Sequence, residues 1–329
     1  MDIKTFANKI SELRIFVVGD VMLDAYIWGK AERLSPEAPV PVVQVEKKES
    51  RPGGAANVAY NLRALGVDTY LFGLVGKDLA AAELKKNLTS SKINSKGIYS
   101  HASLTTTIKT RVIGNKHQLL RIDEEKNITL SATERNAFTN SILEAIKKHA
   151  PHAIIFEDYD KGCIDKDLIE KITAFANKLN IITTVDPKRA NFLHYKNVTL
   201  FKPNFAEIKN GLNAPTLEKN QHSLLQYTSD FLRNQKIKNM MITLSEHGVY
   251  YATPKQAGMH DALIRNIADV SGAGDTVIAI ATRCLAIVLP LQLADAIANV
   301  AGGMVCEYAG VVPVNNKLFF NEIQKLNLL

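Results

Sequence analysis

The sequence predicts an α/β fold with a mostly parallel central sheet, helices on both faces of that sheet and a small β flap. From Ser131 onward, helical patterns alternate with short apolar, β-branched runs. Alternation at this spacing predicts parallel strands joined by helices, with ligands at the carboxyl ends of the strands. The helical stretches are 131–149 and 165–179, and the extended ones are 153–157, 181–185, 198–201 and 240–244.

Two segments do not fit a central strand and predict the flap. Residues 33–46 hold three prolines in an alternating pattern, and proline lacks the N–H group that a central strand donates. Residues 97–123 alternate apolar residues with threonines and cations. We therefore expect one main domain over residues 1–329, with a β lid from about 25–49 and 97–123.

The composition indicates a globular protein whose partners are small anions. The 329 residues are 46% hydrophobic and carry a formal net charge of +7. Nucleic acid is not expected, because no dense Lys/Arg block is interleaved with aromatic residues. Residues 1–13 lack the apolar region of an export signal, Arg283 and Pro290 break the most apolar stretch, and the three cysteines are far apart. A cytoplasmic protein with reduced thiols and no membrane span is expected.

The first strand is predicted at 14–19 and opens into two carboxylates, Asp20 and Asp24. Carboxylates at the carboxyl end of a strand are well placed to accept hydrogen bonds from hydroxyls. Turn chemistry and helix capping explain the same residues equally well.

A glycine turn precedes the first long helical pattern. Gly53 and Gly54 allow the backbone to approach a ligand closely, and Asn57 on the first helical turn offers both a donor and an acceptor. A tight turn before a helix is the alternative explanation.

Cations gather on one face of the second flap segment. Lys109 and Arg111 alternate with apolar residues, and Gln118 and Arg121 follow after the Gly114-Asn115 turn. This set fits a phosphate on the substrate, since Arg binds phosphate by two parallel hydrogen bonds and Lys acts as a point charge. A solvated sheet face is the plainer explanation.

Several polar residues follow predicted strands. Asp158, Asp186 and Lys188 lie at strand ends, and Asn204 precedes Glu207 by three residues. Asn204 and Glu207 are neighbours on one helix face and would hold Mg²⁺ through water. A helix cap with a solvated glutamate is equally possible.

The stretch from Asp269 to Thr276 places glycines at the start of a helix, after an extended apolar run. The free N–H groups and the dipole of a helix N-terminus favour a phosphate or a developing anion there. Asp275 would repel such an anion, so it is either a base beside a transferring phosphoryl group or merely a helix cap. Farther on, Gly302 and Gly303 would allow a flat ring to pack closely.

Two of these stretches together resemble the ribokinase-like (PfkB) family of carbohydrate kinases. Its N-terminal signature is similar to Gly53-Gly54-x-x-Asn57-x-Ala59, and its C-terminal signature to Asp269-x-x-Gly272-Ala273-Gly274-Asp275. Further stretches resemble the heptose-7-phosphate kinase branch. These are 19–24, 33–43, Thr106-Thr107-Ile108-Lys109-x-Arg111, Gln118-Leu119-Leu120-Arg121, Asp158-Tyr159-x-Lys161-Gly162 and Asp186-Pro187-Lys188.

The resemblance implies transfer of the γ-phosphoryl group of ATP to the anomeric hydroxyl of D-glycero-D-manno-heptose 7-phosphate, for lipopolysaccharide core precursors. It makes Asp275 the base, Gly272, Ala273 and Gly274 the anion hole, and Asn204 with Glu207 the Mg²⁺ site. Sugar contacts are expected from Asp20, Asp24, Gly53, Gly54, Asn57, Gln118, Asp158 and Lys161. We assign the 7-phosphate to Arg33, Lys109, Arg111 and Arg121. ATP contacts are expected from Lys188, Asn204, Ser245, Glu246, Gly248, Asp269, Asn299 and Gly302. A homodimer through the lid is also implied, and a K⁺ requirement stays open.

The sequence departs from the family pattern at three places. Ser245 stands where glycine is usual, Arg189 follows Asp-Pro-Lys in place of glycine, and residues 307–311 replace Gly-Lys-Leu-Gly-Thr. The expected contacts to adenine and to K⁺ depend on these three positions. In many relatives an adenylyltransferase domain follows, and we expect none here because the chain ends at Leu329. The alternatives are a kinase for another sugar and a sugar-phosphate binding protein without catalysis. A Rossmann dehydrogenase is disfavoured, because Gly19 opens no Gly-x-Gly-x-x-Gly turn.

Overall fold

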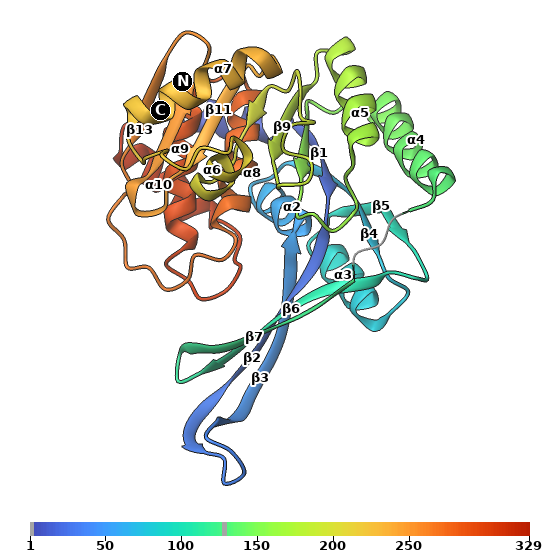
Figure 1. Ribbon diagram of the computed structural model, residues 1–329, viewed down its shortest axis with the longest axis vertical. Helices are drawn as coiled ribbons and strands as arrows, with labels where there is room; N and C mark the ends of the chain where they lie inside the picture. Colours follow the sequence, from blue (N-terminus) through green and yellow to red (C-terminus); the bar gives the residue numbers. More distant parts are fainter. Residues whose placement is uncertain (1–2, 127–129) are drawn as a thin grey trace.

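The computed structural model describes residues 3–126 and 130–329. In this part of the chain, nine strands form a main sheet in the order β13-β12-β11-β10-β9-β8-β1-β4-β5, and four form a second sheet in the order β3-β2-β6-β7 (Figure 1). From β11 to β5 all neighbouring strands of the main sheet are parallel, whereas β12 pairs antiparallel with β11 and with β13. The predicted α/β class with a mostly parallel sheet is confirmed.

The central strands of the main sheet are short and buried, as their apolar sequences predict, whereas the edge strands β5 and β13 are partly exposed. The strands of this sheet are β1 (Arg14–Gly19), β4 (Asp68–Val75), β5 (Asn94–Ser100), β8 (Ala153–Glu157), β9 (Ile182–Asp186), β10 (Leu200–Phe201), β11 (Asn239–Thr243), β12 (Val249–Ala252) and β13 (Ala257–His260).

Helices cover both faces of the main sheet, and an apolar core lies on each side. The first core involves α1 (Ile3–Ser11), α2 (Ala55–Ala64), α3 (Leu79–Ser90), α8 (Ala273–Ala286), α9 (Leu291–Val305) and α10 (Asn316–Lys325). The second involves α4 (Ala132–His149), α5 (Lys166–Lys178), α6 (Phe205–Gly211) and α7 (Gln221–Gln235). No helix in the described ranges is long and apolar enough to cross a membrane.

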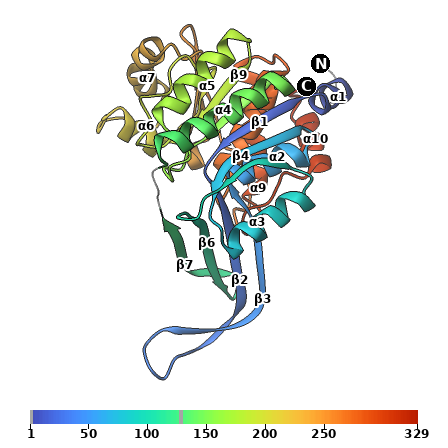
Figure 2. The same ribbon diagram turned by 90° about the vertical axis from the view of Figure 1, so that its right-hand side faces the viewer.

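The second sheet projects from one end of the body as a long arm (Figures 1 and 2). It consists of β2 (Val21–Leu34), β3 (Pro41–Gly54), β6 (Thr105–Gly114) and β7 (His117–Lys126). Asn115 and Lys116 both have positive φ, as a two-residue hairpin turn requires. This lid differs from the expected bounds, because β5 takes residues 94–100 into the main sheet by pairing with β4.

The connection before α8 also differs from the expectation. An extended apolar run was expected there, but residues 261–268 form neither helix nor strand. Ile264 is fully exposed, so its apolar side chain covers no core. Apolar sequence alone therefore gave the wrong local structure at this place.

Candidate active site

The start of α8 lies at the carboxyl ends of the central strands, where the sequence places its glycine motif. Gly272, the residue before the helix, has a φ of 77°, and a Cβ atom there would lie 2.7 Å from the Asn57 Nδ2 atom. Only glycine fits both conditions. The first turn of α8 therefore starts against α2, and its first N–H groups have no partner within the helix.

Asp275 on that first turn is held by two donors from distant parts of the chain. The Asn57 Nδ2 atom donates to its Oδ2 atom at 2.8 Å, and the Tyr159 hydroxyl donates to its Oδ1 atom at 2.8 Å. Burial raises the pKa of Asp275 to about 6, although both hydrogen bonds favour the charged form. The carboxylate is therefore oriented and able to take up a proton near neutral pH.

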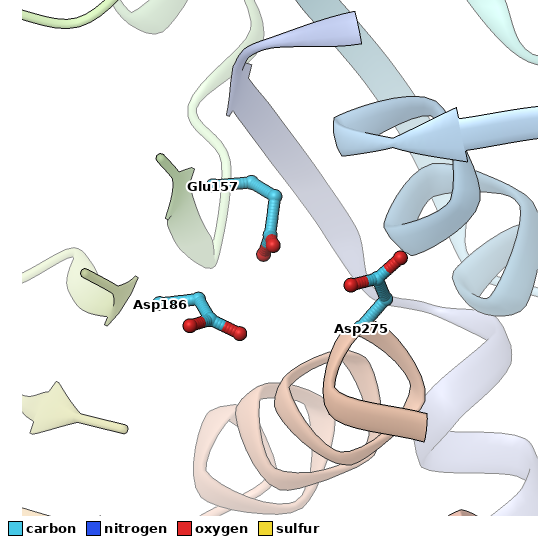
Figure 3. Close-up of side chains that lie close together, drawn as sticks. All are labelled: Glu157, Asp186 and Asp275. Carbon is cyan, nitrogen blue, oxygen red and sulfur yellow. The ribbon is translucent and has the colours of Figure 1, made fainter. Parts of the chain in front are cut away.

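Three carboxyl groups meet beside the start of α8. Glu157 ends β8, Asp186 ends β9, and Asp275 faces them from the helix (Figure 3). One oxygen of each lies within 4.8 Å of the other two. The buried Lys202 ammonium pairs with Asp186 at 2.7 Å. The sheet thus brings cations and carboxylates to the edge where ligands of parallel sheets bind.

The predicted Mg²⁺ pair is engaged in local structure. Asn204 caps α6, its Oδ1 atom accepts the N–H of Glu207 at 2.9 Å, and Glu207 accepts the N–H of Asn204 at 2.8 Å. The other Glu207 oxygen pairs with Lys188. Both the cap and the strand-end position expected for these residues are present, and their role at a metal stays a prediction.

A cavity of about 650 Å³ opens on the other side of α8. Its lining includes five residues that are predicted to contact ATP: Ser245, Glu246, Gly248, Asn299 and Gly302. Ala273 and Gly274 at the start of α8 also line it. The cavity therefore joins the expected nucleotide residues to the start of α8. Lys188 and Asn204 lie on the neighbouring strand ends instead.

The loop after α9 is tied to the lid and to the glycine motif. Asp269 accepts the N–H groups of Ser271 and Gly310 at 2.9 Å each. Arg51 of β3 donates to the carbonyl oxygens of Ala309 and Val311. The N–H group of Val311 donates to the Tyr26 hydroxyl at 2.8 Å. Residues 307–311, which depart from the family pattern, are held by these contacts.

The lid contributes one buried charge pair and several exposed ones. Asp24 of β2 pairs with Arg111 of β6, and both side chains are at most 10% exposed. Lys109 pairs with Asp123 at 3.2 Å and with Glu125 at 3.5 Å. Since Asp24 faces Lys109 and Arg111 faces Arg121 in the register, these side chains share one face. Arg33, Gln118 and Arg121 are exposed, with Arg33 far out on the arm.

Asp20 and Asp158 hold the loop that carries Tyr159. Asp20 accepts the N–H groups of Tyr159, Lys161 and Cys163, and burial raises its pKa to about 6. Asp158 accepts hydrogen bonds from the side chains of Asn191 and Tyr195. Their predicted sugar contacts stay predictions. Gly53 and Gly54 end β3 against β2, directly before α2, which carries Asn57.

Sequence reasoning missed four residues of this region: Glu157, Tyr159, Lys202 and Arg265. Glu157 ends an apolar strand and Lys202 follows one, and that position was a usable signal. Tyr159 stood inside a quoted motif but received no role. Arg265 lines the cavity and pairs with Glu307 and Glu322, and no local pattern marked it.

A comparison with known protein families identifies the class of enzyme. Residues 12–317 match the family described as "pfkB family carbohydrate kinase". The chain belongs to this family and is a sugar kinase.

Curated relatives are named "Bifunctional protein HldE". The protein from Methylobacillus flagellatus is 37% identical over 94% of this chain and 63% of its own length. That from Psychromonas ingrahamii is 39% identical over 93% of this chain and 63% of its own length. The chain thus spans less than two thirds of the length of these relatives.

Solved structures share the ribokinase-like fold. Phosphofructokinase-2 from Escherichia coli in complex with potassium has a TM-score of 0.77 at 15% identity, covering 95% of this chain and 99% of that one. A putative ribokinase from Agrobacterium tumefaciens has a TM-score of 0.72 at 16% identity, covering 96% of this chain and 98% of that one. The small second sheet is the lid of this fold.

Sugar kinases of this family use ATP and Mg²⁺. The residues at the start of α8 fit a divalent cation. Both oxygens of the buried Glu157 lack a hydrogen-bond partner among the described residues, and two further carboxylates face them. Oxygen donors of this kind are what Mg²⁺ binds.

Proposed function

We propose that the chain phosphorylates the anomeric hydroxyl of D-glycero-β-D-manno-heptose 7-phosphate with ATP, giving the 1,7-bisphosphate for ADP-heptose and lipopolysaccharide core synthesis. The observation that carries the chemistry is Asp275, a buried carboxyl held by Asn57 and Tyr159 at the N-terminus of a helix. The relatives at 36–39% identity and the motifs of the heptose branch support the choice of sugar.

Asp275 is the base in this proposal. It accepts the proton of the sugar hydroxyl as that oxygen forms a bond to the γ-phosphorus of ATP. The bond from this phosphorus to the oxygen of the leaving ADP breaks, and ADP takes the electron pair. The N–H groups of Gly272, Ala273 and Gly274 donate to the transferring phosphoryl group, which carries the growing negative charge. Bound Mg²⁺ supplies positive charge to the phosphates.

The two substrates occupy opposite sides of α8. We assign ATP to the cavity lined by Ser245, Asn299 and Gly302. The sugar lies under the lid, near Asn57, and its 7-phosphate meets the cations Lys109, Arg111 and Arg121. Arg33 pairs with Val42 near the far end of the arm and does not reach this phosphate within one chain. Arg111 is the best placed of the three, because it is buried beside Asp24 at the base of the lid. Sugar contacts by Asp20, Asp24 and Lys161 belong to the same proposal.

The lid is also the proposed contact surface of a homodimer. Its outer strand and hairpin tip expose Leu34, Leu119, Leu120 and Ile122, each more than 40% exposed. Exposed apolar patches of this kind mark protein interfaces. Analytical ultracentrifugation of the full chain tests this, and a monomer at all concentrations contradicts it.

Turnover in KCl compared with tetramethylammonium chloride tests the K⁺ requirement.

Turnover with a panel of sugars tests the main proposal. kcat/KM is measured with heptose 7-phosphate, fructose 1-phosphate, fructose 6-phosphate and ribose under the same ATP and Mg²⁺ conditions. We expect the heptose phosphate to be strongly preferred. If it is no better than the others, the choice of sugar fails while the kinase activity stands.

A further inference from the structure

We propose that the guanidinium group of Arg265 is the surface on which the base of the nucleotide stacks. The inference rests on the proposed assignment of ATP to the cavity beside α8, and it adds the residue that receives the purine ring. Arg265 lies in the connection between β13 and α8, before the glycine motif.

The connection between β13 and α8 is attached to α9 by polar contacts at both ends. The Asn299 side chain donates to the carbonyl oxygen of Asp261 at 2.8 Å, and the Ala268 N–H group donates to the carbonyl oxygen of Cys306 at 2.8 Å. Between these anchors, the fully exposed Ile264 lines the cavity. The connection is therefore a wall of the cavity, and an apolar side chain on it borders the space that a ligand would fill.

The edge of the Arg265 guanidinium is held by two carboxylates. Its Nη1 atom lies 3.3 Å from a Glu307 oxygen, and its Nη2 atom lies 3.1 Å from a Glu322 oxygen of α10. Its Nε atom is buried and has no hydrogen-bond partner in residues 3–126 and 130–329. A guanidinium binds phosphate through the donors along its edge. Because carboxylates already occupy that edge, the group is poorly placed to bind a phosphate of the nucleotide.

The Arg265 side chain also lies against α9. A Cβ atom on Gly303 would lie 3.1 Å from both the Cδ and the Nε atoms of Arg265, so the glycine lets the side chain approach closely. The side chain is 11% exposed and lines the cavity. With its edge bound to carboxylates and one side covered by α9, the group meets the cavity through its remaining face. The flat group expected to pack at Gly303 is thus part of the protein.

A guanidinium face suits an aromatic base. Its planar, delocalised charge attracts the electrons of an aromatic ring, and it is more weakly hydrated than an ammonium group. Nucleobases are known to stack on the plane of arginine side chains. The apolar side chains of Leu263, Ile264 and Ile267 line the same cavity. This combination fits an uncharged aromatic ring better than it fits a phosphate or a sugar.

The charges along the cavity indicate the direction of the nucleotide. Glu307 and Glu322 outnumber the single guanidinium that they share, so phosphate is repelled at this end. Ala273 and Gly274 line the cavity at the start of α8, where N–H groups and the helix dipole attract phosphate. The base therefore lies at Arg265, and the phosphates lie at α8.

Nucleotide binding in the absence of sugar tests the role of Arg265. Competition against a fluorescent ATP analogue, with Mg²⁺ present, measures the dissociation constants of ATP and CTP for wild type, Arg265→Met and Arg265→Phe. Both replacements remove the ion pairs, and only Arg265→Phe restores a flat face. We expect Arg265→Met to bind ATP about tenfold more weakly than wild type and Arg265→Phe to recover most of this loss.

CTP separates stacking from a general loss of the cavity. It carries the same phosphates as ATP but a single ring, which covers less of the guanidinium. Arg265→Met should therefore weaken CTP less than ATP. If Arg265→Met binds ATP as tightly as wild type, if Arg265→Phe binds it no better than Arg265→Met, or if ATP and CTP are weakened equally, the stacking role is overturned.

Arg14→Met is a matched control. Arg14 also pairs with a carboxylate, that of Asp68 at 2.8 Å, and its guanidinium lies over the ring of Tyr70, but it starts β1 at the opposite edge of the sheet from the carboxyl ends. This variant should bind ATP and CTP like wild type. An equal loss of ATP affinity in Arg14→Met would contradict a local role for Arg265.

Thermal melting shows whether the variants fold. If Arg265→Met has no cooperative transition, Gly303→Ala replaces it, because the new methyl group displaces the guanidinium from α9. The same weakening of ATP is then expected, and unchanged ATP binding would overturn the proposal. If wild type binds ATP but the variants do not differ from it, only the assignment of Arg265 fails. If wild type binds no ATP, the proposed kinase function fails with it, and the sugar panel is independent of both results.

Discussion

The floor of the pocket and the lid both carry charged residues, but they hold them in different ways. At the floor, Glu157, Asp186, Lys202 and Asp275 are all buried at the ends of rigid parallel strands or on the first turn of α8. On the lid, which is a single projecting sheet, most charged side chains are exposed. The pair of Asp24 and Arg111 is the buried exception.

This difference indicates that the floor of the pocket is suited to the phosphoryl-transfer step and the lid to sugar binding. Buried charges act in a low dielectric and cannot reorganise, which suits stabilisation of a transition state. Exposed charges on an arm are screened by water and salt and can move with it. Transfer chemistry should therefore respond steeply to single changes at the floor, and lid changes should act mainly on sugar binding.

The largest expected effect is at Asp275. Asp275→Asn removes the base but keeps the size of the side chain and its place between Asn57 and Tyr159. We expect kcat to fall by about 10²- to 10⁴-fold, with ATP affinity in a fluorescence titration nearly unchanged. A variant that retains wild-type turnover would remove Asp275 as the base.

The second effect tests the buried pair of the lid. Arg111→Gln leaves Asp24 buried without its cation, so the free energy of unfolding should fall by about 3 kcal/mol. Urea denaturation measures this, and the KM for the sugar phosphate should rise as well. Double replacement by Asp24→Asn and Arg111→Gln should recover part of the stability. A single variant as stable as wild type would show that the pair is not buried in solution.

The third effect is on the pH profile. Burial raises the pKa of Asp275 to about 6, and the deprotonated form is the base. kcat/KM should therefore be constant above pH 6 and fall about tenfold per pH unit below it. Tyr159→Phe removes a hydrogen bond that favours the carboxylate, so the falling limb should move up by about one pH unit.

Tyr195→Phe is the control for this shift. Tyr195 is buried too, but its hydroxyl donates to Asp158 and not to Asp275. The acid limb should stay in place in this variant. A limb that moves equally in both variants would assign the pKa to some other group.

The smallest effect is at Arg121. Its side chain is 51% exposed, and it pairs with Asp123 on the same strand. Arg121→Gln should change the free energy of unfolding by no more than about 1 kcal/mol, while the KM for the sugar phosphate rises. Should it cost as much stability as Arg111→Gln, the contrast between buried and exposed charges would be wrong.

Local patterns predicted the main elements well. The strands 14–19 and 153–157 have the expected bounds, and the glycine motif lies at the start of α8 as expected. Periodicity, buried apolar runs and glycines are properties of neighbouring residues, so the sequence displays them. The segment 261–268 is the counterexample, because its exposed apolar residues are indistinguishable in sequence from a strand.

Contacts between distant residues followed from sequence less well. The motifs of Asn57 and Asp275 were recognised, but their hydrogen bond joins residues 218 positions apart. Glu157 and Asp186 meet because β8 and β9 are neighbours in the sheet, and Lys202 reaches Asp186 from the end of β10. Sequence spacing places each residue at a strand end but does not say which strand ends are adjacent.

The contacts of Arg51 and Tyr26 with residues 309–311 have a consequence for substrate binding. A lid that moves at β2 and β3 must either carry this loop along or break its hydrogen bonds to Val311. The same loop is joined through Gly310 to Asp269, just before the anion hole. If the sugar shifts the lid, the affinity for nucleotide changes with it, and by thermodynamic reciprocity nucleotide changes the affinity for sugar by the same factor.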